Sequence, residues 1–393
     1  MRKRMKIVTG VVVAIVILLL LVGPLAVWRW VPMLRKPGVV KIGCLFALSG
    51  PGRQIGVPSK YVALMANDYF EKEGGIEGKK IQLIFADSKG ESRTTLREFQ
   101  RLVYEEKVCA VIGPTRTGTA VSLFEKIKTA KIPVIMCVGG TPPAVPLKKW
   151  VFKSPQMAIT AVEKIYEYLK KRGIDKVAII TSNDAFGVEG RKNLETVTQR
   201  ENIKIVAKES FGTKDIDMTI QLKKLVATDA QAIICWTIGP AGATVARNFK
   251  SLGAEQILIQ CHGQPDPTYL IAGDAANGTI MPSTKCVVAD QLKEDDPQRE
   301  VVQNFVKEYE EKYGEGQIST HSGYAWDAFM ILANAIKKVG TDPDKIRDAI
   351  EETKGYIGVS GIYNMSAEDH CGLGVDSMVM ITVENGKWKL IEY

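Results

Sequence analysis

Two successive arrays of alternating strand-like and helix-like patterns constrain this chain more than any other feature. From Lys41 onward, short apolar runs typical of buried strands alternate with segments whose apolar residues recur at every third or fourth position, as on one face of a helix. This order predicts βα units around parallel sheets. Because the alternation restarts after residue 155, we expect two similar α/β lobes.

The apolar pattern also predicts individual elements. Strands are expected at residues 41–47, 81–86, 108–112, 133–138, 176–181, 203–207, 232–236 and 256–261. Helices are expected from about Pro58, from about Thr117, and over 93–105, 162–169, 219–226, 241–252, 298–313, 323–339 and 343–353. Near the end, Asn385-Gly386 predicts a hairpin between strands at 377–383 and 387–391.

The segment 108–119 predicts an anion site at the end of a strand. Its apolar run stops at Gly113-Pro114, because proline lacks an N–H donor and restricts the backbone. A helix is expected to begin near Thr117, with its free N–H groups and positive dipole end at this place. The pattern is not a Walker A loop, since Thr119-Ala120 stands where Lys and Ser or Thr are needed, which argues against an NTPase.

The first forty residues predict the compartment. Four basic residues precede residues 7–27, an apolar run of 21 residues broken only by Thr9, two glycines and Pro24. That length spans a hydrocarbon core. A signal-peptide cleavage site is poorly matched at Pro24-Leu25-Ala26. We therefore expect an uncleaved N-terminal transmembrane anchor, with a removed signal peptide as the alternative, and an extracytoplasmic location for the rest of the chain.

The charge balance does not suggest a nucleic-acid partner. The formal net charge is +8, but seven of the 52 basic residues lie before Lys41, where there is no acidic residue. The rest of the chain carries 45 Lys and Arg against 44 Asp and Glu. A net charge of +1 gives no general basic surface for a phosphate backbone.

The seven cysteines predict neither a metal site nor a complete disulfide set. They form no C-x-x-C pair, and their odd number leaves at least one unpaired within the chain. Four of them lie inside apolar strand-like runs, namely Cys44, Cys109, Cys137 and Cys235. A thiol in such a place behaves as a small hydrophobic side chain. We expect buried free thiols, and neither a metal nor a cofactor.

Several short motifs, taken in their order and spacing, resemble one known family over nearly the whole of residues 40–393. They are Ile42-Gly43, Leu48-Ser49-Gly50-Pro51, Gly74-Gly75-Ile76-Glu77-Gly78-Lys79-Lys80-Ile81, Ile112-Gly113-Pro114, Thr117-Gly118, Ile132-Pro133-Val134-Ile135, Gly140-Thr141-Pro142-Pro143, Phe186-Gly187 and Tyr324-Ala325-Trp326-Asp327-Ala328. Together they resemble the type I periplasmic binding proteins of the leucine/isoleucine/valine class, which serve ABC transporters.

The resemblance implies two Rossmann-like lobes joined by three crossings, with the ligand enclosed in the cleft between them. It implies a first lobe of residues 41–155 and 285–355 and a second lobe of 156–284 and 356–393. Such a cleft lies at the carboxyl ends of parallel strands, and the lobes close about a hinge. The expected partners are a small carboxylate-bearing solute, an ABC transporter permease and, through the N-terminal helix, a membrane.

The resemblance also implies which residues bind the carboxylate. In the family a hydroxyl residue and backbone N–H groups of the first lobe hold it, because a buried carboxylate needs donors on both oxygens. Thr117 matches the hydroxyl position, and Gly139, Gly140 and Thr141 match the second loop. The alternative is that Thr117 only caps a helix and Thr141 only occupies a turn.

Other cleft positions follow from the same resemblance. Ile55 matches a place where the family puts a side chain against the ligand, Phe186 matches an aromatic on the second lobe, and Trp236 ends a strand that faces the cleft. The two aromatics fit core packing equally well. Arg116 stands where small polar residues are usual, so it is a candidate either for holding a second acidic group of the ligand or for a solvated side chain.

The loop at 262–266 departs from the amino-acid-binding members, which place an acidic side chain there to receive the ligand ammonium. It reads His262-Gly263-Gln264-Pro265-Asp266, with Gly263 or Gln264 nearest the expected place. Asp266 can take the place of that acidic side chain only if the loop is shifted relative to the amino-acid-binding members. An aliphatic or aromatic carboxylate without an ammonium group is therefore an alternative to an amino acid.

Two other classes of function compete with a solute carrier. A membrane-anchored sensory module would act on a partner receptor, because the residues ahead of the anchor are too few for an output domain. An enzyme is less favoured. His262, His321 and His370 are the only histidines, and neighbours in an extended segment, such as Cys261 and His262, point to opposite faces.

Overall fold

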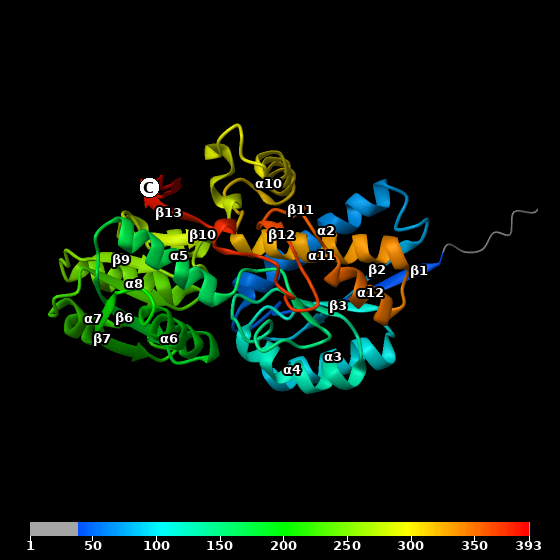
Figure 1. The fold of residues 1–393 in the computed structure, drawn as a ribbon, viewed down its shortest axis with the longest axis horizontal. Coiled ribbons are helices and arrows are strands. Elements are labelled where there is room, and N and C mark those ends of the chain that lie inside the picture. The colour runs from blue at the N-terminus through cyan, green and yellow to red at the C-terminus, as the bar shows by residue number, and fades with distance from the viewer. Residues whose placement is uncertain (1–37, 393) are drawn as a thin grey trace, which may run out of the picture.

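The computed structural model describes residues 38–392, which form two α/β lobes side by side (Figure 1). The first lobe is built on a five-stranded sheet in the order β2-β1-β3-β4-β5, and the second on a seven-stranded sheet in the order β14-β13-β10-β9-β8-β6-β7. The predicted α/β architecture is confirmed for these residues. No helix in this range is both long and apolar enough to cross a membrane, and the anchor predicted at residues 7–27 lies outside the described residues.

The first sheet is entirely parallel and is covered on both faces. Its strands are β1 (Val39–Phe46), β2 (Lys80–Asp87), β3 (Ala110–Ile112), β4 (Val134–Met136) and β5 (Val151–Lys153). One face packs against α3 (Ser92–Gln100) and α4 (Thr117–Ala130), and the other against α2 (Arg53–Lys72), α11 (Thr320–Val339) and α12 (Pro343–Glu351), as Figure 1 shows. α10 (Arg299–Tyr313) lies against α2. Burial on both faces explains the continuous apolar runs of β1 and β3.

The second sheet combines five parallel strands with an antiparallel hairpin. The parallel strands are β6 (Lys176–Ser182), β7 (Lys204–Phe211), β8 (Ala232–Trp236), β9 (Ile257–Gln260) and β10 (Ile280–Ser283). α5 (Ala158–Lys171) and α6 (Ala185–Thr198) cover one face, and α7 (Thr219–Val226) and α8 (Pro240–Ser251) the other. The hairpin is β13 (Val379–Glu384) and β14 (Lys387–Leu390). Its turn, Asn385-Gly386, has φ of 51° and 72°, which confirms the predicted turn.

Some predicted boundaries were wrong for local reasons. α2 begins at Arg53 rather than near Pro58, because the Ile55 and Gly56 N–H groups already bond to the Gly52 carbonyl one turn earlier. The helix predicted over 93–105 stays α-helical only to Gln100 and continues as a π-helical turn, Arg101–Glu105. Residues 151–153 were expected within a crossing segment. They form β5, which pairs with β4 at the edge of the first sheet, and the crossing begins after them.

Side chains tie the crossing segments together beside the cleft. Asp327 on α11 accepts from the N–H groups of Val359 and Ser360, at 2.8 and 2.7 Å, and from the Tyr363 hydroxyl at 3.1 Å. Gln156, in the crossing after β5, donates to the Ser360 carbonyl at 2.6 Å. A hydrogen-bonded cluster of buried side chains therefore joins these segments. All seven cysteines are buried and free, which confirms the burial predicted for Cys44, Cys109, Cys137 and Cys235.

Candidate functional site

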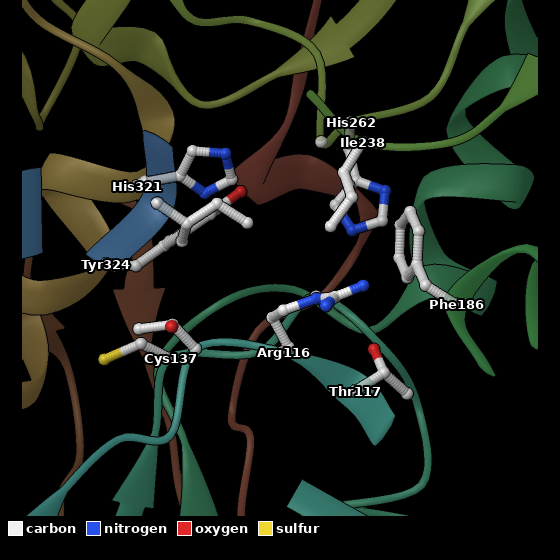
Figure 2. Close-up of a pocket in the computed structure, with 12 residues that line it drawn as sticks. Arg116, Thr117, Cys137, Phe186, Ile238, His262, His321 and Tyr324 are labelled. Carbon is white, nitrogen blue, oxygen red and sulfur yellow. The ribbon is translucent and has the colours of Figure 1, made fainter. Parts of the chain in front are cut away.

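A small cavity lies between the two lobes, where strands of both sheets end (Figure 2). The segments after β3 and β4 and the start of α11 line it from the first lobe, and the segments after β6, β8 and β9 line it from the second. Its volume is about 20 Å³, which holds about one water molecule. A solute of amino-acid size therefore fits only if the side chains that line the cavity move apart.

The start of α4 forms the floor of the cavity. Arg116 is the N-cap residue, and Thr117 is the first residue of the helix, so the alternative that Thr117 serves as the cap is wrong. The Ala120 N–H is the first to bond back, to the Arg116 carbonyl at 2.9 Å. The three preceding N–H groups have no partner within the helix, and they form the positive end of its dipole. Thr117 lines the cavity and is 5% exposed, so hydroxyl and backbone donors converge at this place.

The loop after β4 is in close contact with the second lobe. Gly139 lines the cavity, and a Cβ placed on it would lie 2.5 Å from His262 Nε2, so only glycine fits there with the lobes in contact. Gly140 lies behind Thr117, and Thr141 faces α6 instead of the cavity. The Thr141 N–H donates to Glu189 Oε1 at 3.1 Å, and its hydroxyl accepts from Asn193 at 3.2 Å.

Arg116 joins the two lobes at the rim of the cavity. Its Nη2 lies 3.1 Å from Asp184 Oδ2, and its Nη1 donates to the Gly90 carbonyl at 3.3 Å. Asp184 also caps α6, because its Oδ1 accepts from the Gly187 N–H at 3.0 Å. The guanidinium is therefore bound to the opposite lobe rather than simply solvated.

Apolar side chains close the cavity from both lobes. Ile55 on α2 lines it from the first lobe, and Phe186 and Ile238 line it from the second. Trp236 is fully buried behind Phe186, with ring centroids 5.8 Å apart, and does not reach the cavity. Gln264 is also fully buried and donates to the Thr237 carbonyl at 2.9 Å, away from the cavity. Trp236 and Gln264 thus support the wall from behind.

Three polar residues that the sequence did not predict as ligand contacts face one another across the cavity. Figure 2 shows His321 and Tyr324, both from α11, opposite His262 from the loop after β9. Both ring nitrogens of His262, Nε2 of His321 and the Tyr324 hydroxyl are buried and make no hydrogen bond of normal geometry in the described part of the chain. Sequence reasoning weighed these histidines only as metal or catalytic candidates. The only sequence signal for a ligand contact at His262 was that this loop lacks the acidic side chain of the amino-acid-binding members.

Burial keeps both histidines neutral at pH 7. Desolvation, helped by the nearby Lys153 ammonium, lowers the pKa of His262 to about 3. Desolvation lowers the pKa of His321 to about 4, although the Gly263 backbone acts in the opposite direction. Each imidazole therefore offers both a donor and an acceptor.

No acidic side chain among residues 38–392 lines this cavity. Asp266, the candidate replacement for the acidic residue of the amino-acid-binding members, caps α9 (Pro267–Leu270) instead and accepts from the Thr268 N–H at 2.6 Å. Burial raises the pKa of Asp266 to about 6. Nor does any group of three or more His, Cys, Asp or Glu in this range have the placement to hold a metal ion.

A buried lysine stands directly behind the loop after β4. Lys153, the last residue of β5, is fully buried and donates to the carbonyls of Gly140, Gln156 and Gly139 at 2.6, 3.0 and 3.4 Å. Desolvation lowers its pKa to about 8. The ammonium fixes the loop and places a positive charge behind this wall, which favours an anion in the cavity.

Comparisons with known proteins agree with this fold. Residues 39–387 match the family model of the periplasmic binding proteins. The Leu/Ile/Val-binding protein homolog 7 of Brucella suis is 23% identical over 326 residues, which cover 79% of this chain and 80% of that relative.

Solved structures show the same architecture. An extracellular ligand-binding receptor from Rhodopseudomonas palustris HaA2 superposes with a TM-score of 0.83 and 26% identity, covering 90% of this chain and 100% of that one. The branched-chain amino acid transporter substrate binding protein LivJ from Streptococcus pneumoniae, solved in complex with isoleucine, has a TM-score of 0.77 and 23% identity, covering 90% and 99%. This chain belongs to the periplasmic binding protein family, in its type I, Leu/Ile/Val-binding class.

Proposed function

We propose that the protein captures a small carboxylate-bearing solute in the interlobe cavity and delivers it to an ABC transporter permease. The observation that carries this proposal is the start of α4, which presents the Thr117 hydroxyl and unused backbone N–H groups to the cavity floor. Such a helix start binds anions, and Lys153 adds a buried positive charge behind the adjacent loop. The family itself implies an extracytoplasmic location.

The predicted site residues divide into two groups in this proposal. Thr117 and Gly139 hold the carboxylate, Arg116 closes the rim, and Ile55 and Phe186 contact the rest of the solute. The second group shapes these walls from behind and consists of Gly140, Thr141, Trp236 and Gln264.

Capture in this proposal is a closure of two lobes, without covalent chemistry. A cavity of about 20 Å³ admits no solute in the form described here, so its lining side chains must move apart around a bound one. The solute therefore enters an open form and binds to the first lobe at α4. Closure then adds Phe186 and His262 from the second lobe and forms the Arg116–Asp184 pair over the entrance.

A membrane-anchored sensor acting on a partner receptor is the second candidate, favoured by the apolar run at residues 7–27. Transporter genes beside this gene, and loss of solute uptake on its deletion, would support the carrier. Unchanged uptake with a lost transcriptional or chemotactic response would support the sensor.

The ligand assignment is tested by a thermal-shift screen of the purified full-length protein against amino acids, aromatic acids, hydroxy acids and dicarboxylates. A bound solute at 100 times its Kd should stabilise the protein by about 2.7 kcal/mol. Thr117→Ala should weaken that solute at least about tenfold, because a hydrogen bond to a charged group is lost. Thr129→Ala, at the exposed far end of α4, is the matched control and should bind normally. No response to any carboxylate would overturn the proposal.

A further inference from the structure

We propose that His262, His321 and Tyr324 form a polar subsite that recognises a hydroxyl or keto oxygen of the ligand, so that the solute is a hydroxy or oxo carboxylic acid. This inference rests on the proposed function, because it names the ligand class of the same cavity. It concerns the wall opposite α4, formed by α11 and the loop after β9.

Unpaired polar atoms point to a ligand at this wall. His262 is 2% exposed and Tyr324 is 2% exposed, and His321 is 7% exposed. Within residues 38–392, four of their polar atoms make no hydrogen bond of normal geometry, namely Nδ1 and Nε2 of His262, Nε2 of His321 and the Tyr324 hydroxyl. The Gly139 backbone next to His262 and the Thr320 side chain next to Tyr324 are near enough only for weaker contacts. Buried polar groups in folded proteins are nearly always paired. Their gathering on one cavity indicates that a bound solute supplies the missing partners.

The charges around the subsite disfavour an ammonium group. The buried charge acting on His262 is the Lys153 ammonium, which has the same sign as the ammonium of an amino acid. No carboxylate of the described residues lines the cavity, and Asp266 is bonded to α9. A buried cation without a carboxylate partner is costly. An amino acid would have to place its ammonium here without compensation.

A neutral oxygen fits the same groups without that cost. A neutral imidazole and a phenol each donate and accept, so they pair with a hydroxyl in either direction and with a keto oxygen as donors. The ligand carboxylate then lies at the start of α4, beside Arg116 and Thr117, where the helix start supplies donors. The site is thus polar at both ends and apolar at Phe186, Ile55 and Ile238.

Glu189 is an acidic group that stands close behind this region and offers an alternative. Its Oε1 accepts from Thr141 and Asn193, while its Oε2 is buried and has no partner in the described chain. It does not line the cavity, because Gly140 lies in front of it. If an amino acid were bound, Glu189 would be the group to receive its ammonium.

The test compares solutes that share one carbon skeleton and differ only in the group beside the carboxylate. The full-length protein is titrated by calorimetry with 2-hydroxy-4-methylpentanoate, 4-methyl-2-oxopentanoate, leucine and 4-methylpentanoate, and with the matching phenyl series. We expect the hydroxy or oxo acid of one series to bind at least about tenfold more tightly than both the amino acid and the plain acid.

Variants assign the preference to the subsite. Tyr324→Phe and His321→Phe should reduce the preference of the hydroxy or oxo acid over the plain acid at least about fivefold, because each removes one hydrogen-bonding atom. Tyr166→Phe is the matched control. It removes a buried hydroxyl in the core of the second lobe, bonded to the Leu194 carbonyl and Thr198, and should leave the preference unchanged.

The outcomes separate this inference from the proposed function. If leucine or phenylalanine binds more tightly than its hydroxy and oxo analogues, and Glu189→Gln abolishes that binding, the subsite assignment is overturned while the carboxylate site stands. Equal binding of all four solutes in a series also overturns the subsite assignment. If none of the carboxylates binds, the proposed function itself fails.

Discussion

Arg116 and Asp184 form an ion pair that bridges the two lobes, with 3.1 Å between Nη2 and Oδ2. Arg116 stands at the start of α4 in the first lobe, and Asp184 at the start of α6 in the second. The two side chains are 18% and 19% exposed, so solvent screens the pair only in part. Because the pair requires the lobes to be in contact, it stabilises the closed form.

Breaking this pair should weaken ligand binding through the open–closed equilibrium. Arg116→Gln and Asp184→Asn should each raise Kd about threefold to fivefold, since a partly exposed ion pair contributes about 1 kcal/mol or less. Asn keeps the cap of α6, so Asp184→Asn removes charge with little other damage. Calorimetry on both single variants and the double variant measures the coupling.

The double variant distinguishes two roles of Arg116: a latch, meaning the ion pair with Asp184 that holds the lobes closed, and a direct contact with the ligand. For a latch, the double variant should bind no worse than either single variant, and high salt should reduce the wild-type advantage. If Arg116 instead held an acidic group of the ligand, Asp184→Asn would free the guanidinium and tighten binding. Tighter binding by Asp184→Asn would therefore contradict the latch.

Gly139 should be essential for closure. A Cβ on Gly139 would lie 2.5 Å from His262 Nε2, so Gly139→Ala should hold the lobes apart and raise Kd at least about tenfold. Gly118→Ala is the matched control in the same cleft, because its Cβ would make an ordinary contact of 3.5 Å with Ala185. Calorimetry gives both affinities, and the melting temperature without ligand tests folding. Equal affinities of the two variants would refute the steric role.

The fold followed from local information. The start of α4 at Thr117 and the hairpin at Asn385-Gly386 are set by turn chemistry and apolar period within a few residues, and both predictions were confirmed. Boundaries failed where backbone hydrogen bonds between near neighbours, which the apolar pattern does not show, decided them. α2 begins before Pro58 because the loop at Gly52 accepts its first N–H groups.

The site was less predictable because its walls meet across the lobes. Arg116 bonds to a residue 68 positions away, and no periodicity within one element shows that partner. Thr141 lies beside the expected carboxylate loop, yet Glu189 and Asn193 on α6 turn it away from the cavity. His321 comes from α11, so only the packed structure brings it opposite His262.

Lys153 should make the free energy of unfolding rise with pH between about pH 8 and pH 10. Its pKa is about 8 in the folded protein, against about 10.4 in an unfolded chain. Between these values the unfolded chain binds more protons, so rising pH stabilises the folded state, by up to about 3 kcal/mol from this residue. Lys153→Met should lose this gain and should destabilise the protein at pH 9.5, because three carbonyls lose their donor.

The measurement is urea unfolding at pH 7.0, 8.5 and 9.5, taken as the difference between wild type and variant. The difference is needed because buried thiols act in the opposite direction: burial raises the pKa of Cys137 to about 12, so rising pH favours the unfolded chain there. Lys80→Met, an exposed residue of β2, is the control. Parallel curves for wild type and Lys153→Met would contradict the prediction.

Acid should open the lobes through His262 and His321. In the closed form their pKa values are about 3 and 4, whereas a solvated imidazole has a pKa of about 6.5. The open form therefore binds more protons as pH falls below 6.5, and the closed form loses about 1.4 kcal/mol per pH unit and histidine. Above pH 6.5 this stabilisation of the closed form is complete. Small-angle scattering should show the radius of gyration rising between pH 7.5 and pH 5.

A double variant isolates the histidines from other titrating groups. The Lys153 ammonium beside them keeps its charge over this pH range, because its pKa is about 8, whereas Asp266 in the same loop as His262, with a pKa of about 6, titrates in the wild type and in the variant alike. The radius of gyration of His262→Phe/His321→Phe should therefore rise clearly less than that of the wild type from pH 7.5 to 5. Tyr324→Phe changes the same cavity without removing an imidazole and should open as the wild type does. An unchanged radius in the wild type, or an equal rise in the double variant, would show that the histidines do not control closure.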